Sequence, residues 1–315
     1  MIEMRVAEIE YVAAQVKRFR FVRPDGGRVP NFSAGSHVVV TMRDGDRTRR
    51  NPYSLMGSLA DNQGYEISVL KVPDSRGGSR FMHDCVSVGD LIGVTVPVNL
   101  FPIDFRARKY IFAAGGIGIT PFIPMLEQVA AMGREFELHY AMRDEARGAY
   151  AAMLRTRYGE RVRQYRSSLG ERICVERMHE NQPLGTHFYV CGPEQMAESF
   201  LSAALAMGWP EQNLHVERFA APPVGLAFRV RLDRSGVEVD VGEHESMLDA
   251  IERAGVQAPF LCRGGACGAC ETRVIACTGD ISHNDHYLGP EDRIAGKKIM
   301  ICVSRLKGGE LVLDL

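Results

Sequence analysis

The chain has 315 residues, of which 45% are hydrophobic, and its formal net charge at pH 7 is −1. This length can bury more than one core, and the balanced charge argues against a nucleic-acid-binding protein, which would carry a basic surplus. No apolar run approaches the length that spans a bilayer, and residues 1–19 lack the uninterrupted apolar core of a signal peptide. We therefore expect a soluble, cytoplasmic protein that binds neither membranes nor nucleic acids.

Residues 1–104 have the pattern of strands joined by turns. The runs SHVVVTM (36–42) and GYEISVLKV (64–72) are rich in β-branched residues, while RPDGGR (23–28) and RDGD (43–46) are typical of turns. Helical periodicity is weak in this stretch. The pattern predicts a small β-barrel.

Residues 105–225 alternate between strands and helices. Apolar, strand-like runs over 109–115 and 135–142 frame a glycine-rich turn and a helix that ends before Gly133, and a further strand, turn and helix follow over 186–208. Glycine-rich turns between a strand and a helix bring backbone N–H groups to a phosphate. The repeated pattern predicts an α/β domain, and the turn alone leaves nucleotide binding open because glycine-rich turns of this kind are common.

A linker, PPVGLA (222–227), precedes the last stretch of the chain. This stretch begins with a predicted hairpin over 228–241 and continues with a helix that has Ser246 as its N-cap and Gly255 as its stop. A cysteine-rich loop follows the helix. A hairpin, a helix and such a loop suit a small separate domain.

Three cysteines of this loop, Cys262, Cys267 and Cys270, have the spacing C-x4-C-x2-C, and Cys302 follows alone. Zinc sites usually consist of two well-separated C-x2-C pairs, whereas this order matches plant-type [2Fe-2S] clusters. Glycine and alanine fill most of the gaps, as a loop needs if it is to wrap closely around sulfide with its N–H groups pointing at sulfur. We expect a [2Fe-2S] cluster, with zinc as the alternative.

The fourth ligand has two candidates. Cys277 lies seven residues after Cys270 in an expected turn, and Cys302 lies in a strand-like run, KIMICVSR (298–305). A tight loop that already supplies three thiolates approaches the cluster from one side, so a different element is better placed to supply the fourth. We expect Cys302 to be the ligand and Cys277 to be a bystander.

The segments CRGGACGACETRV and CVSRLKGGELVLDL resemble the C-terminal ferredoxin domain of the phthalate dioxygenase reductase family, which are single-chain reductases that supply Rieske-type oxygenases. The resemblance covers the whole chain. It implies a multidomain fold with an FMN-binding antiparallel β-barrel over 1–104, a ferredoxin-reductase-type α/β domain for NAD(H) with the linker over 105–225, and a β-grasp, plant-type [2Fe-2S] ferredoxin domain over 226–315.

The flavin motif of this family, R-x-Y-S-L, is matched by NPYSL (51–55). The match implies that Tyr53 packs on the flavin ring and that Ser54 lies near its N5. Asn51 replaces the motif's arginine, which would answer the charge of the flavin phosphate. We expect Arg49 or Arg50 to supply that charge instead, and the sequence does not decide which of them faces the phosphate.

The other motifs carried by the resemblance are GGS for the flavin phosphate, GGIGITP for the pyridine nucleotide, CGP near the nicotinamide and ERF at the end of the flavoprotein part. The catalytic candidates are Ser54 and Cys191, and the metal ligands are Cys262, Cys267, Cys270 and Cys302. The cofactor-binding candidates are Arg49, Arg50, Asn51, Tyr53, Ser54, Leu55, Gly77, Gly78, Ser79, Gly115, Gly116, Gly118, Thr120, Pro121, Cys191, Gly192, Pro193 and Phe219.

The resemblance implies an NADH-dependent oxidoreductase that passes electrons from NADH to FMN, to the [2Fe-2S] cluster and to a Rieske-type terminal oxygenase. A flavin suits this path because it accepts a hydride and releases its electrons singly. Asp144 and Glu145 beside Arg143 do not favour binding of a 2′-phosphate, although the positive charge of the arginine leaves NADPH as an alternative electron donor. We expect a monomer. The alternatives are a reductase for another ferredoxin or a cytochrome, and a non-catalytic iron–sulfur redox sensor.

One further stretch contains residue types that bind metals. His283 and His286 flank Asp285 in SHNDHY (282–287), near the place where the chain is two residues longer than is usual for the family. We interpret this stretch as a polar surface loop.

Overall fold

The computed structural model describes residues 1–45, 47–73, 77–219 and 224–315. The chain forms two compact units. The first contains Met1–Val38, Tyr53–Lys71 and Val86–Phe219, and the second contains the described residues of Val39–Pro52, Val72–Cys85 and Ala220–Leu315. Pro222 and Pro223 of the predicted linker lie outside the described residues, and the three-domain division of the chain stays a prediction. Within the described ranges, no helix is long and apolar enough to cross a bilayer.

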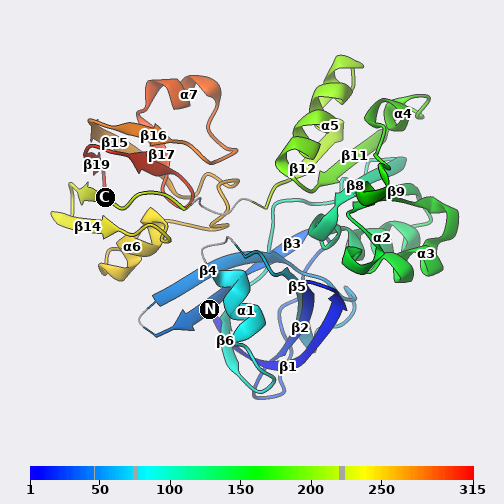
Figure 1. Ribbon diagram of the computed structural model, residues 1–315, viewed down its shortest axis with the longest axis horizontal. Helices are drawn as coiled ribbons and strands as arrows, with labels where there is room; N and C mark the ends of the chain where they lie inside the picture. Colours follow the sequence, from blue (N-terminus) through cyan, green and yellow to red (C-terminus); the bar gives the residue numbers. More distant parts are fainter. Residues whose placement is uncertain (46, 74–76, 220–223) are drawn as a thin grey trace. The chain divides into compact units, whose positions relative to one another are not determined.

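The antiparallel barrel predicted for the N-terminal stretch is confirmed (blue to cyan in Figure 1). Its elements are β1 (Ile2–Ala13), β2 (Val16–Val22), β3 (Ser36–Asp44), β4 (Arg47–Ser54), β5 (Gly64–Leu70), α1 (Gly78–Asp84), β6 (Leu91–Val94) and β7 (Val98–Asn99). The sheet order is β4-β3-β6-β1-β2-β5, with β7 beside β3, and β1 runs antiparallel to both β2 and β6. An antiparallel bridge between Met56 and Glu66 joins the chain just after β4 to β5, so the two ends of the sheet meet.

Alternation along β2 shows how the barrel forms its core. Phe19 and Phe21 are fully buried, because every second side chain of a strand points to the same face. Arg18 and Arg20 point the other way, and their guanidinium groups lie 3.4 Å and 2.8 Å from the Glu66 carboxylate on the neighbouring strand β5. Apolar packing inside and cross-strand ion pairs outside therefore favour the same register.

The nucleotide domain is a parallel sheet with helices on both faces. Its elements are β8 (Lys109–Gly115), α2 (Phe122–Ala131), β9 (Glu135–Met142), α3 (Ala151–Tyr158), β10 (Val162–Arg166), α4 (Val175–His179), β11 (Thr186–Cys191), α5 (Glu194–Ala206) and β12 (Leu214–Glu217). The order is β10-β9-β8-β11-β12, and all pairs are parallel. The chain moves outward in one direction after β8 and in the other after β11. The carboxyl ends of these two strands therefore form the switch point at which such sheets bind ligands.

Residues of β8 alternate between the two faces of this sheet. Tyr110 and Phe112 pack with α2 and α3 in one buried cluster, whereas Ile111 and Ala113 pack with α4 and α5 in another. The helices lie on opposite sides of the sheet in Figure 1. A strand that is buried on both faces must be apolar throughout, which explains the continuous apolar run that predicted it.

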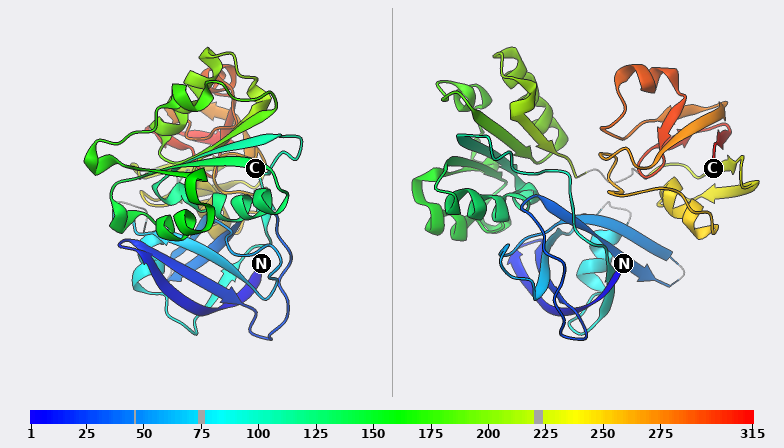
Figure 2. Two further views of the ribbon diagram at one scale, coloured as in Figure 1. Left: turned by 90° about the vertical axis from the view of Figure 1, so that its right-hand side faces the viewer. Right: turned by 180° about the vertical axis from the view of Figure 1, so that it is seen from behind.

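The C-terminal domain has the predicted hairpin, helix and cysteine loop. Its elements are β13 (Phe228–Leu232), β14 (Val237–Val241), α6 (Met247–Arg253), β15 (Glu271–Cys277), β16 (Asp280–Ser282), α7 (Pro290–Ala295), β17 (Lys298–Met300), β18 (Arg305–Lys307) and β19 (Leu311–Leu313). The main sheet has the order β14-β13-β19-β15-β17, and β16 pairs with β18. Ser246 caps α6 as predicted, since its side chain accepts a hydrogen bond from the Asp249 N–H. The helix, yellow in Figure 2, buries Leu248 and Ile251 against the sheet.

Candidate functional site

The four cysteines expected to bind the cluster come together as two pairs. Cys270 Sγ lies 3.1 Å from Cys302 Sγ, and the Cys267 thiol hydrogen-bonds to Cys262. Cys262, Cys270 and Cys302 are buried, and Cys267 is half-buried. Cys277 ends β15 instead, where its thiol donates to the Gly279 carbonyl oxygen at 3.0 Å. The strand-like run around Cys302 is interrupted: β17 ends at Met300 and a turn carries the cysteine.

The surroundings of these thiols fit a [2Fe-2S] cluster. The Gly264 N–H lies 3.3 Å from Cys262 Sγ. The hydrogen bond from Cys267, followed by backbone N–H groups of the loop, lowers the pKa of Cys262. Backbone donors aimed at sulfur stabilise thiolates. In the part of the chain that the structure describes, no three His, Cys, Asp or Glu side chains are arranged to hold one metal ion. Paired thiols are what a two-iron cluster needs, since each iron takes two of them.

The loop that follows β16 is a surface loop in part, as predicted, since His286 and Tyr287 are exposed, but Asp285 is buried and the His286 N–H donates to the Gly265 carbonyl oxygen of the cysteine loop at 3.0 Å. The Asp285 side chain is fully buried and accepts the N–H groups of Tyr287 and Leu288 at 3.2 Å and 2.8 Å. A Cβ atom at Gly268, whose φ is +75°, would lie 2.4 Å from the Tyr287 ring. Asp285 is polar and yet buried, because its carboxylate accepts hydrogen bonds from backbone N–H groups of its own loop instead of from water.

The two glycine-containing turns of the nucleotide domain meet at the switch point. A Cβ atom at Gly115 would lie 2.6 Å from the Pro193 ring, and one at Gly118 would lie 2.2 Å from the Cys191 carbonyl oxygen. Only glycine permits this approach of GGIGITP to CGP. A Cβ atom at Gly116 would meet nothing within 4 Å, so the turn leaves its backbone open there. Both turns fit a bound pyridine nucleotide.

Other residues of the nucleotide loops are structural in this state. The Thr120 hydroxyl is buried and donates to the Ile117 carbonyl oxygen at 3.0 Å. Pro121 is the N-cap of α2, and Gly192 lies against Gly115. Phe219, at the end of ERF, is 47% exposed.

Cys191 and Ser54 lie close to the carboxyl group of Glu217, which is not among the predicted site residues. Cys191 Sγ lies 3.9 Å from Glu217 Oε2, and Cys191 pairs with Glu217 in the register of β11 and β12. Burial raises the pKa of Glu217 to about 8, against the smaller effects of Ser54 and Cys191, and burial also raises the pKa of the Cys191 thiol. The Ser54 hydroxyl makes no hydrogen bond of good geometry to any residue that the structure describes, although it lies near enough to lower the pKa of Glu217. Glu217 is half-buried as a residue, but its carboxyl group is enclosed by protein.

An acidic residue at the carboxyl end of a strand, beside a glycine-proline turn, is the signal that would have found Glu217. Within the ERF motif, the predicted binding residue is the aromatic Phe219, and Glu217 is the residue that the structure adds. A glutamate with a pKa near 8 is mostly neutral at pH 7 and can donate a hydrogen bond.

The raised pKa of Glu217 predicts a pH-dependent stability. The folded protein holds this proton up to about pH 8, whereas the unfolded chain releases it near pH 4.5. The free energy of unfolding should therefore fall as pH rises from about 4.5 to 8, by up to about 5 kcal/mol at about 1.36 kcal/mol per pKa unit, and Glu217→Gln should remove most of that fall. Urea unfolding of FMN-free protein at three pH values, followed by the fluorescence of Trp209, the one tryptophan, measures it. The exposed Glu211→Gln serves as control, and equal slopes in wild type and Glu217→Gln would contradict the assignment.

Strand β4 carries most of the NPYSL stretch, and its alternation shows which arginine faces the GGS turn, where the flavin phosphate is predicted to bind. The Arg49 guanidinium lies beside Gly77, 3.2 Å from the position of a Cβ atom there, and the Asn51 amide lies 2.4 Å from the corresponding position at Gly78. Arg49 also pairs with Asp44 at 2.9 Å. Arg50, between them, points to the other face of β4 and pairs with Glu252 at 3.0 Å. Arg49 and Asn51 are therefore the polar groups at GGS.

The turn at Gly77 and Gly78 fits a flavin phosphate, because side chains there would fill the space between the turn and the polar groups of β4. Ser79 is buried, and its hydroxyl accepts the Val72 N–H at 3.1 Å. In the first unit, Tyr53 is half-buried, and the Leu55 N–H donates to the Ser36 carbonyl oxygen at 2.8 Å.

The geometry at β4 predicts different effects for its two arginines. Arg49→Ala should weaken FMN binding about ten-fold, or about 1.4 kcal/mol, because it removes a charge-assisted contact to the phosphate. Arg50→Ala should change FMN binding by less than about two-fold, since this side chain faces away. Titration of the flavin-free variants with FMN, followed by flavin fluorescence, distinguishes them. If neither variant weakens binding, another group holds the phosphate.

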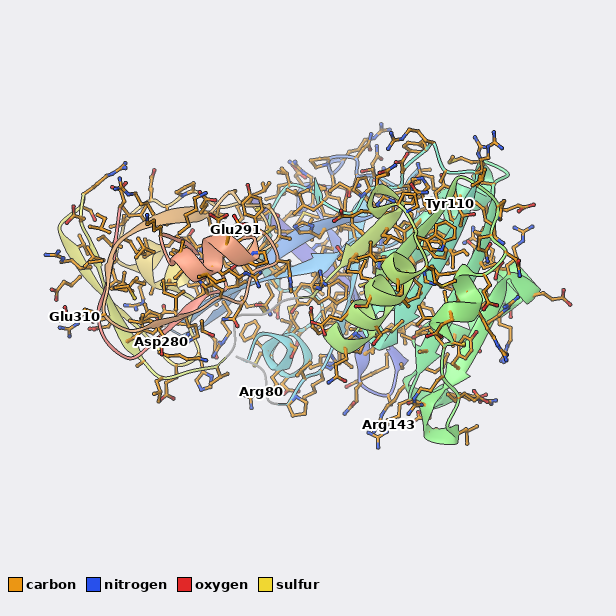
Figure 3. The ribbon with its side chains drawn as sticks, turned by 90° about the horizontal axis from the view of Figure 1, so that it is seen from above. Arg80, Tyr110, Arg143, Asp280, Glu291 and Glu310 are labelled. Carbon is orange, nitrogen blue, oxygen red and sulfur yellow. The ribbon has the colours of Figure 1, made fainter. Side chains whose placement is uncertain are left out.

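Arg143 directly follows β9 and is exposed at the rim of the nucleotide domain, where Figure 3 labels it. The Asp144 side chain accepts the Arg147 N–H at 3.0 Å, and the Glu145 carboxylate lies 3.3 Å from the Arg166 guanidinium. These carboxylates thus lie beside Arg147 and Arg166, and their negative charge disfavours a 2′-phosphate.

The whole chain is similar to known reductases. A family model described as 2Fe-2S iron-sulfur cluster binding domain matches residues 230–307, and one described as dimethylamine monooxygenase subunit DmmA-like, N-terminal domain, matches 98–214. The heme-dependent oxidative N-demethylase beta subunit of Ectopseudomonas mendocina is 41% identical over 315 residues, covering 100% of this chain and 99% of that protein. The carnitine monooxygenase reductase subunit of Escherichia coli is 40% identical, with coverages of 100% and 98%.

Phthalate dioxygenase reductase of Burkholderia cepacia is 33% identical, covering 100% of this chain and 97% of that protein. A solved structure of phthalate dioxygenase reductase, described as a modular structure for electron transfer from pyridine nucleotides to [2Fe-2S], aligns with a TM-score of 0.90 at 33% identity. It covers 100% of this chain and 98% of its own.

Proposed function

Because this chain belongs to the phthalate dioxygenase reductase family, we propose that it is the NADH-dependent reductase component of an oxygenase system. It is an oxidoreductase whose cofactors are FMN, a [2Fe-2S] cluster and NADH. Electrons pass from NADH to FMN, to the cluster and then to the oxygenase. The observation that carries this proposal is the pairing of four thiols in a chain that matches such reductases from end to end.

The flavin supplies the conversion of a two-electron hydride into single electrons. The protein's part is to bind and orient. We assign Ser54 and Cys191 as the catalytic residues and add Glu217, whose neutral carboxyl group holds a proton beside the Cys191 thiol. Full burial of Cys191 raises its pKa and keeps it a thiol, so it acts by packing and hydrogen bonding rather than as a nucleophile.

The remaining roles follow the placement of the residues. We propose that Arg49 and Asn51, with Gly77 and Gly78, hold the flavin phosphate, and that Tyr53 and Leu55 lie at the flavin ring. The nucleotide is assigned to the turns at 115–121 and 191–193. The cluster ligands are Cys262, Cys267, Cys270 and Cys302.

Cofactor content and two electron acceptors test this function. The purified protein should contain about one FMN, two irons and two acid-labile sulfides per chain. It should oxidise NADH with ferricyanide, which takes electrons from the flavin, and with cytochrome c, which takes them from the cluster. Zinc without sulfide would end the proposal, and a full cofactor complement without steady NADH turnover would favour a redox sensor.

The partner is proposed more finely as a Rieske-type terminal oxygenase. Plant-type clusters have potentials near about −400 mV and Rieske centres between about −150 and +300 mV, so this transfer is downhill. A second candidate, a heme-dependent oxidative N-demethylase, is favoured by the 41% identity to the beta subunit of such an enzyme. Mixing the NADH-reduced protein anaerobically with each oxygenase, and following the Rieske or haem absorbance, distinguishes them. The genes beside this one would name the partner to try first.

We also propose that the protein is a cytoplasmic monomer. None of the eight cysteines, all of which lie in the described residues, forms a disulfide, which suits a reducing compartment. Sedimentation of the holoprotein tests the monomer, and a stable dimer would contradict it.

A further inference from the structure

Arg50 makes an ion pair that the flavin motif does not explain. Its guanidinium lies 3.0 Å from Glu252 Oε2 and 3.6 Å from Asp249 Oδ1, and both carboxylates are on helix α6. Glu252 is 202 residues from Arg50 along the chain. Arg50, Asp249 and Glu252 all belong to the second compact unit, which contains most of β4 together with the cluster domain. The pair is only partly exposed, at 22% for Arg50 and 19% for Glu252. Limited exposure reduces screening by water and salt.

A second arginine shares the same two carboxylates. Arg263 directly follows the cluster cysteine Cys262, and its side chain is only 4% exposed. Its guanidinium lies 3.0 Å from Asp249 Oδ1 and 2.5 Å from Glu252 Oε1, and stacks on the Phe260 ring at 3.9 Å. Arg263 also has a φ of +52°, a conformation that a non-glycine residue adopts at a cost. The ion pairs hold the start of the cysteine loop in this conformation.

The four groups form one network with no net charge. Two carboxylates on α6 receive one guanidinium from the cysteine loop and one from β4. Asp249 is further fixed by the Ser246 hydroxyl, which donates to its second oxygen at 2.6 Å. Removing one member of a buried network leaves the others incompletely compensated, so the effects of such changes are coupled.

We propose that Arg50 is a positioning residue that ties the flavin-motif strand to the cluster loop through Glu252, Asp249 and Arg263. The inference rests on the proposed function, and deepens it by naming the contact that sets the rate of electron passage from flavin to cluster. The rate of electron transfer depends steeply on the distance between the two redox groups and on how rigidly they are held. An ion pair between the strand that carries the flavin motif and the helix beside the cluster loop fixes both. Arg49 and Asn51 on the opposite face of β4 leave Arg50 free for this role.

Three variants of the full-length holoprotein test the proposal. Arg50→Gln removes the charge with little loss of volume, Arg50→Lys restores it, and Arg253→Gln is the matched control. Arg253 lies on the same helix and pairs with Glu245 at 3.0 Å, within the C-terminal domain. For Arg50→Gln we expect NADH-dependent reduction of cytochrome c to fall about ten-fold while ferricyanide reduction stays within about two-fold of wild type. Arg50→Lys should recover part of the loss, and Arg253→Gln should show none.

Hydrogen exchange supplies a readout apart from turnover. Arg50→Gln should speed exchange of the backbone amides of both β4 and α6, whereas Arg253→Gln should affect α6 alone. Unchanged exchange in β4 together with wild-type cytochrome c reduction would overturn the proposal. So would an equal loss with both acceptors and loss of FMN, because Arg50 would then be a flavin ligand. Lack of iron and sulfide in the wild type itself would instead be a failure of the proposed function.

If Arg50→Gln gives poorly folded protein, Glu252→Gln replaces it. This variant keeps the helix and weakens the same contact from the other side. The proposal then requires the same split between the two acceptors, and equal retention of both activities overturns it.

Discussion

Replacing Cys302 with serine is expected to abolish the [2Fe-2S] cluster or leave it severely weakened, and with it the NADH-dependent reduction of cytochrome c. Cys302 is buried and its sulfur lies 3.1 Å from that of Cys270, so the substitution removes a thiol that is already in place beside another predicted ligand. A serine hydroxyl is a poor ligand because it does not ionise as a thiol does. Iron and sulfide analysis, with EPR of the reduced protein, measures the loss. Ferricyanide reduction should continue, since it needs only the flavin.

Cys277→Ser is the matched control for this prediction. The change has the same chemistry, in the same domain, but Cys277 only donates to the Gly279 carbonyl oxygen. The cluster and both activities should remain. The reverse result, with the cluster lost in Cys277→Ser and kept in Cys302→Ser, would transfer the fourth ligand to Cys277.

Shortening the chain to end at Phe219 is expected to separate the two electron exits. The buried clusters of the nucleotide domain use residues before this point, whereas the core of the cluster domain uses residues from Phe228 onward. The shortened protein should therefore fold, bind FMN and oxidise NADH with ferricyanide. It should lose most reduction of cytochrome c and all support of an oxygenase, because the cluster thiols are gone.

Adding the separate domain 226–315 should restore little of that activity, because a free chain lacks the effective concentration that a linker provides. Truncation at Phe219 also removes the two carboxylates that pair with Arg50, so hydrogen exchange of the backbone amides of β4 should be faster in the shortened protein. Undiminished oxygenase support from the shortened chain would mean that the flavin passes electrons directly and that the cluster is not the exit.

The elements best predicted from sequence are those in which one local pattern decides. The apolar run of β8, the cap of α6 at Ser246 and the C-x4-C-x2-C loop each depend on neighbouring residues, and the structure has all three. The contact of Cys302 with Cys270 followed from a simple constraint, that a tight loop supplies three thiols from one side.

What the sequence left open depends on contacts between distant residues. The side of β4 that Arg50 faces is set by carboxylates some two hundred residues away, so no local pattern reports it. Glu217 gains its raised pKa only when β12 lies beside β11 and encloses the carboxyl group. Asp285 looks like a surface residue because its partners are backbone N–H groups, which every sequence contains.

The carboxylates of α6 also bear on how reductases of this kind exchange parts during evolution or in engineered fusions. A ferredoxin domain taken from another reductase brings its own residues at the positions of Asp249 and Glu252, whereas the guanidinium that completes the network is encoded near the start of the gene. A chimaera that joins residues 1–225 of this chain to a foreign ferredoxin therefore needs acidic residues at both positions, or a compensating replacement of Arg50. Compatibility of swapped modules is thus decided at a barrel strand as well as at the junction.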